Sequence, residues 1–269
     1  MIINPPSPPA VSKFLAQNKI APGRDVLGWR HMFGVLAPST NTIVEPDIHA
    51  MAVKGVTTHM ARIHITDPDI SSDAKMEALL LQIRDEILRS IDRVKTAKVD
   101  SLVMGMSLET FWGGLEGNKA FVKRLEDYSG LKVNSGAQAC AKALNLLNVK
   151  KVAVLTPYQP IGDLNVRKFF ADLEIEVVAL KGLRCPTATS IAQVSPEAIR
   201  DALVELAVPD AQAIVQVGTN LSMMRIADEA ERWLKRPVIA INAATWWSAL
   251  RNADIHDQIE GCGILFREL

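Results

Sequence analysis

The chain has 269 residues, of which 48% are hydrophobic and 22% charged, as in packed globular proteins of one large domain or two small ones. Thirty basic and thirty acidic side chains leave the formal net charge near zero, which disfavours nucleic acid as a partner. No apolar run approaches the roughly 20 residues that a membrane helix needs, and no basic segment followed by an apolar core marks a secretory signal.

The cysteines and histidines do not form the patterns of metal sites. Three cysteines are widely spaced, at Cys140, Cys185 and Cys262. Such spacing disfavours a disulfide framework and favours a reducing, cytoplasmic location. The five histidines show no ligand spacing either, so no metal site is predicted.

The order of predicted elements indicates the fold class. Residues 1–31, which open with four prolines, are predicted to be an N-terminal arm that either lies on a partner subunit or is disordered. Short apolar runs predict strands at 33–37, 56–65, 101–105, 152–155, 175–180, 213–217 and 238–241. Helical spacing of apolar residues predicts helices at 76–94 (behind the caps Ser71, Ser72 and Asp73), 137–147, 162–173, 196–208, 223–234 and 244–252. Strands alternating with helices predict an α/β fold with parallel sheets.

Two pairs of similar segments indicate an internal duplication. Residues 35–41 (VLAPSTN) resemble 154–158 (VLTPY), 119 residues later when the prolines are matched. Residues 102–108 (LVMGMSL) resemble 215–221 (VQVGTNL), with their glycines 113 residues apart. Ligands of parallel α/β sheets bind beyond the carboxyl ends of the strands. These four polar strand ends are therefore expected to converge on one cleft.

Each strand end carries groups suited to binding an anion. Ser39, Thr40 and Asn41 offer a seat for a carboxylate, although the same residue types also cap turns. Gly105 and Gly218 either let the backbone approach a ligand or simply turn the chain.

The neighbours of these glycines complete the predicted binding set. Thr219 and Asn220 are expected to donate hydrogen bonds, and Met106 is included among the substrate-binding residues. Tyr158 is expected to bind a substrate oxygen, or else to cap the core.

Four segments resemble the aspartate/glutamate racemase superfamily, and most of all its maleate cis-trans isomerases and arylmalonate decarboxylases. They are residues 33–45 (FGVLAPSTNTIVE), 104–114 (MGMSLETFWGG), 155–165 (LTPYQPIGDLN) and 213–252. The resemblance spans about residues 32–265. It implies two Rossmann-like halves related by a pseudo-twofold axis, with the active site between them. The first half would hold residues 32–135 and 240–269, and the second 136–239. A small carboxylate or carbonyl substrate and no cofactor are also implied.

The resemblance also assigns roles to individual residues. Ser39 and Asn41 match the family's carboxylate-binding turn, and Tyr158 and Asn165 match its tyrosine and asparagine in the second half. Ser107 matches a residue of the oxyanion-binding loop. The catalytic cysteines of these families correspond, in our interpretation, to Gly105 and Gly218, which predicts a variant without a catalytic thiol.

Glu109 is the candidate general acid or base in place of a thiol. It lies four residues after Gly105, beside Phe111 and Trp112, where an apolar setting would raise the pKa of its carboxyl. It also fits the simpler role of an acid at a helix N-terminus. Ser107 is predicted to be an oxyanion donor, because a nucleophilic serine would need a base beside it.

Three functional hypotheses follow. The first is a cofactor-independent isomerase or lyase that stabilises an enolate; a hydrolase of a small amide, imide or lactone, with water activated by Glu109, is its alternative. The second is a non-catalytic protein that binds small carboxylates. The third is an interaction protein that uses the N-terminal arm. A homodimer or homotetramer is expected.

Overall fold

In a computed structural model of the protein, residues 24–269 are described, and they form two four-stranded parallel sheets. The first sheet has the order β2-β1-β3-β4, with β1 (His31–Pro38), β2 (Val56–Ile63), β3 (Ser101–Met104) and β4 (Lys132–Asn134). The second has the order β6-β5-β7-β8, with β5 (Lys151–Thr156), β6 (Glu176–Gly182), β7 (Ala213–Gln216) and β8 (Val238–Ala240). The two orders coincide when β5 is matched with β1. The prediction of an α/β fold with two similar halves is confirmed.

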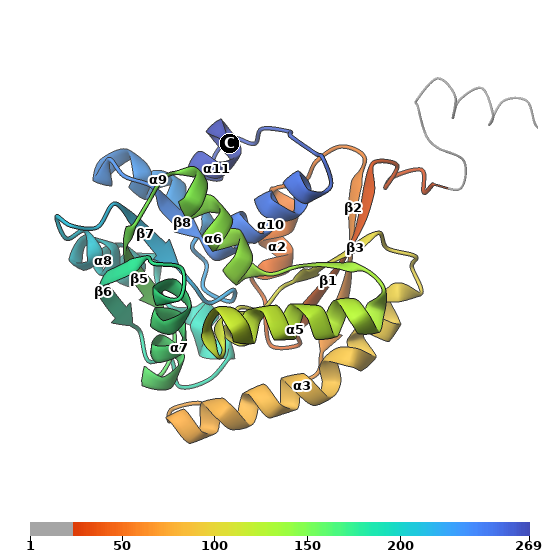
Figure 1. Cartoon of the computed structure of the whole chain (residues 1–269), viewed down its shortest axis with the longest axis horizontal. Coiled ribbons are helices and arrows are strands. Elements are labelled where there is room, and N and C mark those ends of the chain that lie inside the picture. Colours follow the sequence, from red (N-terminus) through yellow and green to blue (C-terminus); the bar gives the residue numbers. More distant parts are fainter. Residues whose placement is uncertain (1–23) are drawn as a thin grey trace, which may run out of the picture.

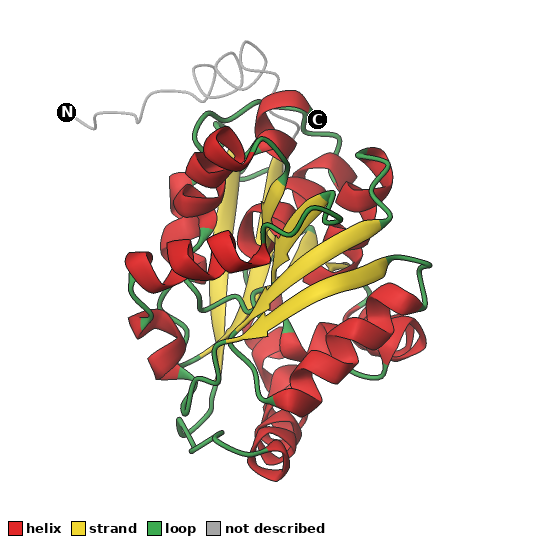
Figure 2. Ribbon diagram, turned by 90° about the vertical axis from the view of Figure 1, so that its left-hand side faces the viewer, coloured by secondary structure: helices red, strands yellow, loops and turns green. Residues whose placement is uncertain are grey.

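Helices lie on both sides of the strands (Figure 2). They are α2 (Val44–Ala50), α3 (Asp73–Lys95), α4 (Leu108–Phe111), α5 (Gly114–Ser129), α6 (Gly136–Leu146), α7 (Pro160–Ala171), α8 (Pro196–Leu206), α9 (Met224–Leu234), α10 (Ile241–Asn252) and α11 (Ile264–Glu268), with a 3-10 turn η1 (Thr189–Gln193). The Ser72 side chain caps α3 by accepting a hydrogen bond from the Lys75 N–H at 3.4 Å. Figure 1 shows α3 below the sheets, where its amino-terminal end lies beside α7 of the other half.

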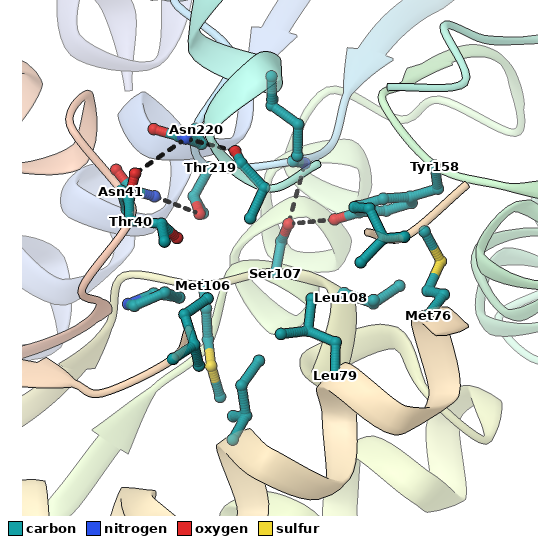
Figure 3. Close-up of a pocket in the computed structure, with 17 residues that line it drawn as sticks. Thr40, Asn41, Met76, Leu79, Met106, Ser107, Leu108, Tyr158, Thr219 and Asn220 are labelled. Carbon is teal, nitrogen blue, oxygen red and sulfur yellow. Dashed lines mark hydrogen bonds between the residues drawn. The ribbon is translucent and has the colours of Figure 1, made fainter. Parts of the chain in front are cut away.

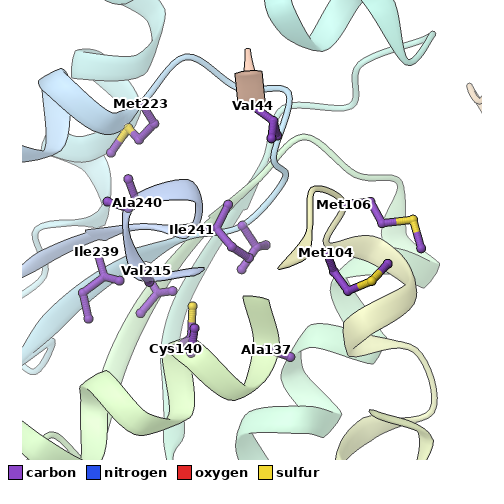
Figure 4. Close-up of a cluster of buried hydrophobic side chains, with 14 of the residues drawn as sticks. Val44, Met104, Met106, Ala137, Cys140, Val215, Met223, Ile239, Ala240 and Ile241 are labelled. Atoms are coloured by element: carbon purple, nitrogen blue, oxygen red, sulfur yellow. The ribbon is translucent and has the colours of Figure 1, made fainter. Parts of the chain in front are cut away.

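A buried apolar cluster joins the two halves around α6 and α10. Residues 241–250 of α10 are all buried, and this helix packs against α6 and α2. Figure 4 shows Cys140 of α6 among Val215 and Ile241 in this cluster. Burial of aliphatic surface on this scale is the main source of stability for the junction. It also fixes how the carboxyl ends of the two sheets face each other.

The strand registers refine the internal repeat. Phe33 pairs with Ser101 and Val152 pairs with Ala213, which relates β1 to β5 by 119 residues and β3 to β7 by 112. The glycines that match by residue type, Gly105 and Gly218, are therefore one position out of register. Gly105 N–H donates to Leu36 O at 2.7 Å, and the equivalent bond in the second half runs from Val217 N–H to Leu155 O at 2.9 Å.

Several elements were not predicted, and α5 and β4 are the most substantial. Glycines at 113, 114 and 117 weaken the helical signal at the start of α5. Three residues are too few for an alternating pattern, so β4 gives no signal of its own. Of the predicted arm, residues 1–23 lie outside the described part. Within residues 24–31, Arg24 pairs with Asp100 and Arg30 pairs with Asp257 of the same chain.

Candidate active site

A cavity opens where the carboxyl ends of the strands of both sheets meet, and the space within it that the centre of a water-sized molecule can occupy is about 70 Å³. Most of its polar lining comes from the segments that follow β1, β3, β5 and β7, as the strand-end argument predicted. The lining residues of this kind are Thr40, Asn41, Ser107, Tyr158, Gly218, Thr219 and Asn220. Both halves therefore contribute to one site (Figure 3).

Ser107 and Tyr158 meet across the cavity (Figure 3). Their oxygens, Oγ and Oη, lie 2.5 Å apart, and Ser107 Oγ also accepts a hydrogen bond from the Gly218 N–H at 2.9 Å. Both side chains are buried, with 2% and 4% exposed. Burial raises the pKa of Tyr158 well above its ordinary value, against the smaller opposing effect of Ser107, so the phenol is neutral. The pair presents uncharged hydroxyl groups held by a main-chain donor.

A second network joins the other two strand ends. Asn41 Nδ2 donates to Thr219 Oγ1 at 3.1 Å, and Thr219 Oγ1 donates to Gly105 O at 3.1 Å. Asn41 Oδ1 also accepts from the N–H groups of Ile43 and Val44 at 3.0 Å, at the start of α2. Since these side chains already bond to one another, their first role is to hold the halves in register.

Asn220 links the two halves through further hydrogen bonds. Its Oδ1 accepts the Thr42 N–H at 2.9 Å, and its Nδ2 donates to Ala188 O at 2.9 Å. Among the described residues, the main-chain N–H groups of Met106, Ser107, Thr219 and Asn220 donate no hydrogen bond. These amides follow β3 and β7 and are the groups left for a ligand oxygen.

The rest of the lining is mainly aliphatic. It consists of Pro38, Ile65, Ile70, Met76, Leu79, Ile83, Met106, Leu108, Ala188 and Ile191. Three of these side chains project from one face of α3, which covers the cavity (Figure 3). None of the 17 lining residues carries a charge. The sequence marked α3 as an amphipathic helix, but nothing in its spacing distinguishes a helix that lines a ligand cavity from one that covers a sheet.

Four predicted site residues lie outside this lining. Ser39 bonds to Ile65 through its hydroxyl, and Asn165 accepts the Gly113 N–H at 2.8 Å. Gly105 is buried between β1 and α2, where an added Cβ would lie 3.0 Å from Ala37 Cβ and from Leu36 O.

Glu109 is the fourth, and its position changes the expected chemistry. It lies on α4 with 5% of its surface exposed, and its Oε1 accepts a hydrogen bond from Arg84 Nε at 2.7 Å. Burial raises the pKa of its carboxyl, and Arg84 partly offsets that shift. The carboxylate therefore faces α3 rather than the cavity, because α4 turns its side chain away from the end of β3.

The described cysteines lie away from the cavity lining as well. Burial raises the pKa of Cys140 to about 12 and that of Cys185 to about 11, so neither is a thiolate at neutral pH. At Gly218 both the backbone conformation and the Pro157 ring disfavour a side chain. Its φ is +102°, and an added Cβ would lie 2.5 Å from Pro157 Cδ.

Within residues 24–269, no group of three or more His, Cys, Asp or Glu side chains is placed to hold a metal ion. In the same range, no helix combines the length and the apolar character that a membrane crossing requires.

Known proteins are similar to this chain in sequence and in fold. The chain is 27% identical over 226 residues to arylmalonate decarboxylase of Bordetella bronchiseptica, which covers 80% of this chain and 90% of that protein. It is 22% identical over 244 residues to maleate isomerase of Pseudomonas putida, covering 87% and 96%.

Solved structures agree on the fold. A mutant of Nocardia farcinica maleate cis-trans isomerase with a covalently bound succinylcysteine intermediate superimposes with a TM-score of 0.79 at 20% identity, covering 89% of this chain and 99% of that one. A liganded mutant of arylmalonate decarboxylase gives 0.73 at 20% identity, covering 89% and 100%. The family model for arylmalonate decarboxylase matches residues 79–266, well over half of the sequence. The chain therefore belongs to the arylmalonate decarboxylase family.

Proposed function

We propose that the protein is a lyase that works without a cofactor and removes carbon dioxide from a small dicarboxylate bearing an apolar substituent. One observation carries this proposal. The hydroxyl pair of Ser107 and Tyr158, held by the Gly218 N–H, faces an aliphatic wall in a cavity that no charged side chain lines.

This arrangement suits the formation and capture of an enolate. When the bond from Cα to one carboxylate breaks, carbon dioxide leaves and the electron pair stays on the substrate as an enolate of the second carboxylate. The Ser107–Tyr158 pair and the free amides after β3 and β7 stabilise the new charge on oxygen. One well-placed donor of this kind contributes on the order of 3–4 kcal/mol. A carboxylate held against the aliphatic wall of α3 is destabilised, and it loses that charge as it leaves.

The same hydroxyl pair supplies the final proton. Tyr158 is neutral, so it gives its proton to Cα and takes another from water, while Ser107 donates a hydrogen bond to the phenolate in between. This assigns Tyr158 the task that a thiol would perform in a cysteine-dependent enzyme.

Loss of carbon dioxide is favoured over isomerisation by thiolate addition. The Nocardia farcinica isomerase has been solved with a succinylcysteine intermediate, which requires a cysteine at the substrate. The described cysteines of this chain are absent from the cavity lining. An enolate route needs only hydrogen-bond donors and a proton, both of which Ser107 and Tyr158 supply.

The alternatives have less support. A hydrolase needs a base for water, and Glu109, the predicted one, is held by Arg84 outside the lining. A binding protein without activity would use the same donors, and only turnover separates it from an enzyme.

The test is a substrate panel followed by proton NMR in D2O. It comprises 2-alkylmalonates and 2-arylmalonates, maleate, hydantoins and cyclic imides. We expect a substituted malonate to lose carbon dioxide and to gain one deuterium at Cα. Tyr158→Phe should lower kcat by about 100-fold or more, the cost typical of a lost oxyanion donor.

The chain offers a matched control, because its second tyrosine, Tyr128, is exposed on α5. Tyr128→Phe should leave turnover unchanged. Conversion of maleate in the absence of decarboxylation would refute the proposal. Thermal stabilisation by malonates with no product would instead identify a binding protein.

A further inference from the structure

A closed set of polar side chains surrounds the peptide groups of Tyr158 on the side away from the cavity. Thr156 ends β5, Asp163 lies in the first turn of α7, and Arg184 follows β6. The three converge behind Tyr158, although they are up to 28 residues apart in sequence.

Four contacts connect the set. Thr156 Oγ1 donates to Asp163 Oδ1 at 2.5 Å and accepts the Tyr158 N–H at 3.1 Å. Arg184 Nη1 donates to the Tyr158 carbonyl oxygen and pairs with Asp163 Oδ2 at 2.6 Å. The ring of contacts therefore runs from the Asp163 carboxylate through the Thr156 hydroxyl to the Tyr158 N–H. From the Tyr158 carbonyl oxygen it returns through Arg184 to Asp163.

Burying the charge of this ring costs free energy of folding, which argues that the ring does more than cap a helix. Thr156 is fully buried and Asp163 is 5% exposed. A charge in such a place is tolerated only when partners surround it, and removing one partner is strongly destabilising.

The first half of the protein builds the equivalent turn around a more exposed ion pair. Arg62 donates to the Asn41 carbonyl oxygen at 2.7 Å and pairs with Glu45, and these two side chains are 37% and 35% exposed. The 119-residue relation places Ala37 opposite Thr156 and Val44 opposite Asp163. There, Asn41 Oδ1 caps the start of α2. The ring in the second half differs because its carboxylate is buried, with 7% of the Asp163 side chain exposed, and because Thr156 joins that carboxylate to the Tyr158 N–H.

We propose that Thr156, Asp163 and Arg184 are positioning residues that hold Tyr158 at its hydrogen-bond distance from Ser107. Their effect on turnover rests on the proposed function, whereas their effect on the tyrosine itself does not. A displacement of about 1 Å in a reacting group can lower the rate on the order of 100-fold. Holding Tyr158 rigidly in place can therefore outweigh the free energy that burying the Asp163 charge costs.

The charge of Asp163 adds a second effect. Burial is the largest cause of the raised pKa of Tyr158. The negative charge of Asp163 raises that pKa further and so helps to keep the phenol protonated. The pKa of Asp163 is itself raised by burial, and Thr156, Arg184 and Arg167 act against that shift. Removing the negative charge should therefore make Tyr158 easier to ionise.

The test uses the Tyr128→Phe protein, in which Tyr158 is the only tyrosine. Incorporation of 3-fluorotyrosine gives one fluorine resonance, and its phenol is more acidic than that of tyrosine, which brings the titration closer to the pH range in which the protein is folded. We expect Asp163→Asn to move this titration to lower pH. Asp172→Asn, a matched change just past the other end of α7, should leave it in place. This measurement needs no substrate, so it stands even if the proposed activity fails.

Thr156 provides the test of positioning. Thr156→Val keeps the shape and removes the hydroxyl, whereas Thr156→Ser keeps the hydroxyl. We expect Thr156→Val to shift the fluorine resonance and to lower kcat by about 10- to 100-fold with little change in KM, and Thr156→Ser to restore both. Near-UV circular dichroism identifies any variant that fails to fold.

Two results would overturn the inference. One is a titration of Tyr158 that occurs at the same pH in the Tyr128→Phe protein, in its Asp163→Asn variant and in its Asp172→Asn variant. The other is a folded Thr156→Val protein with the wild-type resonance and rate, or a Thr156→Ser protein as impaired as the valine variant.

Discussion

Asp47→Asn is predicted to stabilise the protein above neutral pH. Asp47 lies on α2, and its Oδ2 accepts a hydrogen bond from Asn242 Nδ2 at 2.8 Å. Asn242 also donates to Thr219 O at 2.9 Å, so the carboxylate supports the edge of the cavity. Burial raises the pKa of Asp47 from 3.8 to about 6, although Asn242 and the charge of Arg225 act in the opposite direction. An asparagine keeps an acceptor for Asn242 and removes the charge.

The magnitude follows from the linkage between proton binding and folding. A carboxyl whose pKa is higher in the folded state binds its proton more tightly there, so it favours folding below pH 3.8. That contribution is lost as the pH rises from 3.8 to about 6. At 1.36 kcal/mol per pKa unit, the loss is at most about 3 kcal/mol. At pH 8 we therefore expect Asp47→Asn to raise the free energy of unfolding by about 1–3 kcal/mol, and at pH 4 by much less.

Urea unfolding between pH 4 and pH 8 measures this difference. Asp201→Asn is the control, because Asp201 is exposed on α8 and its replacement should have a small effect at both pH values. Glu109, Asp163 and Glu231 also have raised pKa values, but they are common to both proteins and cancel in the comparison. A variant that is less stable than wild type at pH 8, or a difference that does not grow with pH, would refute the reasoning.

Three further predictions concern the candidate site. Gly218→Ala should cost at least about 1–3 kcal/mol of stability by urea unfolding, because φ is +102° and the new Cβ meets Pro157; Gly105→Ala, crowded but with ordinary φ, should cost less, and equal losses would contradict this. Glu109→Gln should leave kcat within about threefold, because an amide still accepts the Arg84 bond; a folded variant without turnover would restore Glu109 as the general acid or base. Replacing each of Cys140, Cys185 and Cys262 by alanine should leave kcat nearly unchanged, whereas abolished turnover in a folded variant would show that a thiol is used.

Most of the fold could be predicted from the sequence, because local patterns indicate which segments of an α/β protein form buried strands and which form the covering helices. Apolar runs of four to six residues gave the buried strands, and the 3.6-residue spacing gave helices such as α3. The repeated strand ends around Pro38 and Pro157 indicated two similar halves. By contrast, α5 was hidden by its glycines and β4 by its length of three residues.

The cavity shows where local patterns stop being informative. Thr40, Asn41, Ser107, Tyr158, Gly218, Thr219 and Asn220 could be named in advance, because the ends of parallel strands must face a common edge. Only the tertiary structure decided that Ser107 bonds to Tyr158 across the halves, that α3 closes the cavity with aliphatic side chains, and that Glu109 turns toward Arg84. The residues in each of these contacts lie 25 or more positions apart, and the packing of α10 against α6 and α2 sets how the halves face each other. The sequence alone determined which groups reach the strand ends, and the docking of the two halves determined which of them meet.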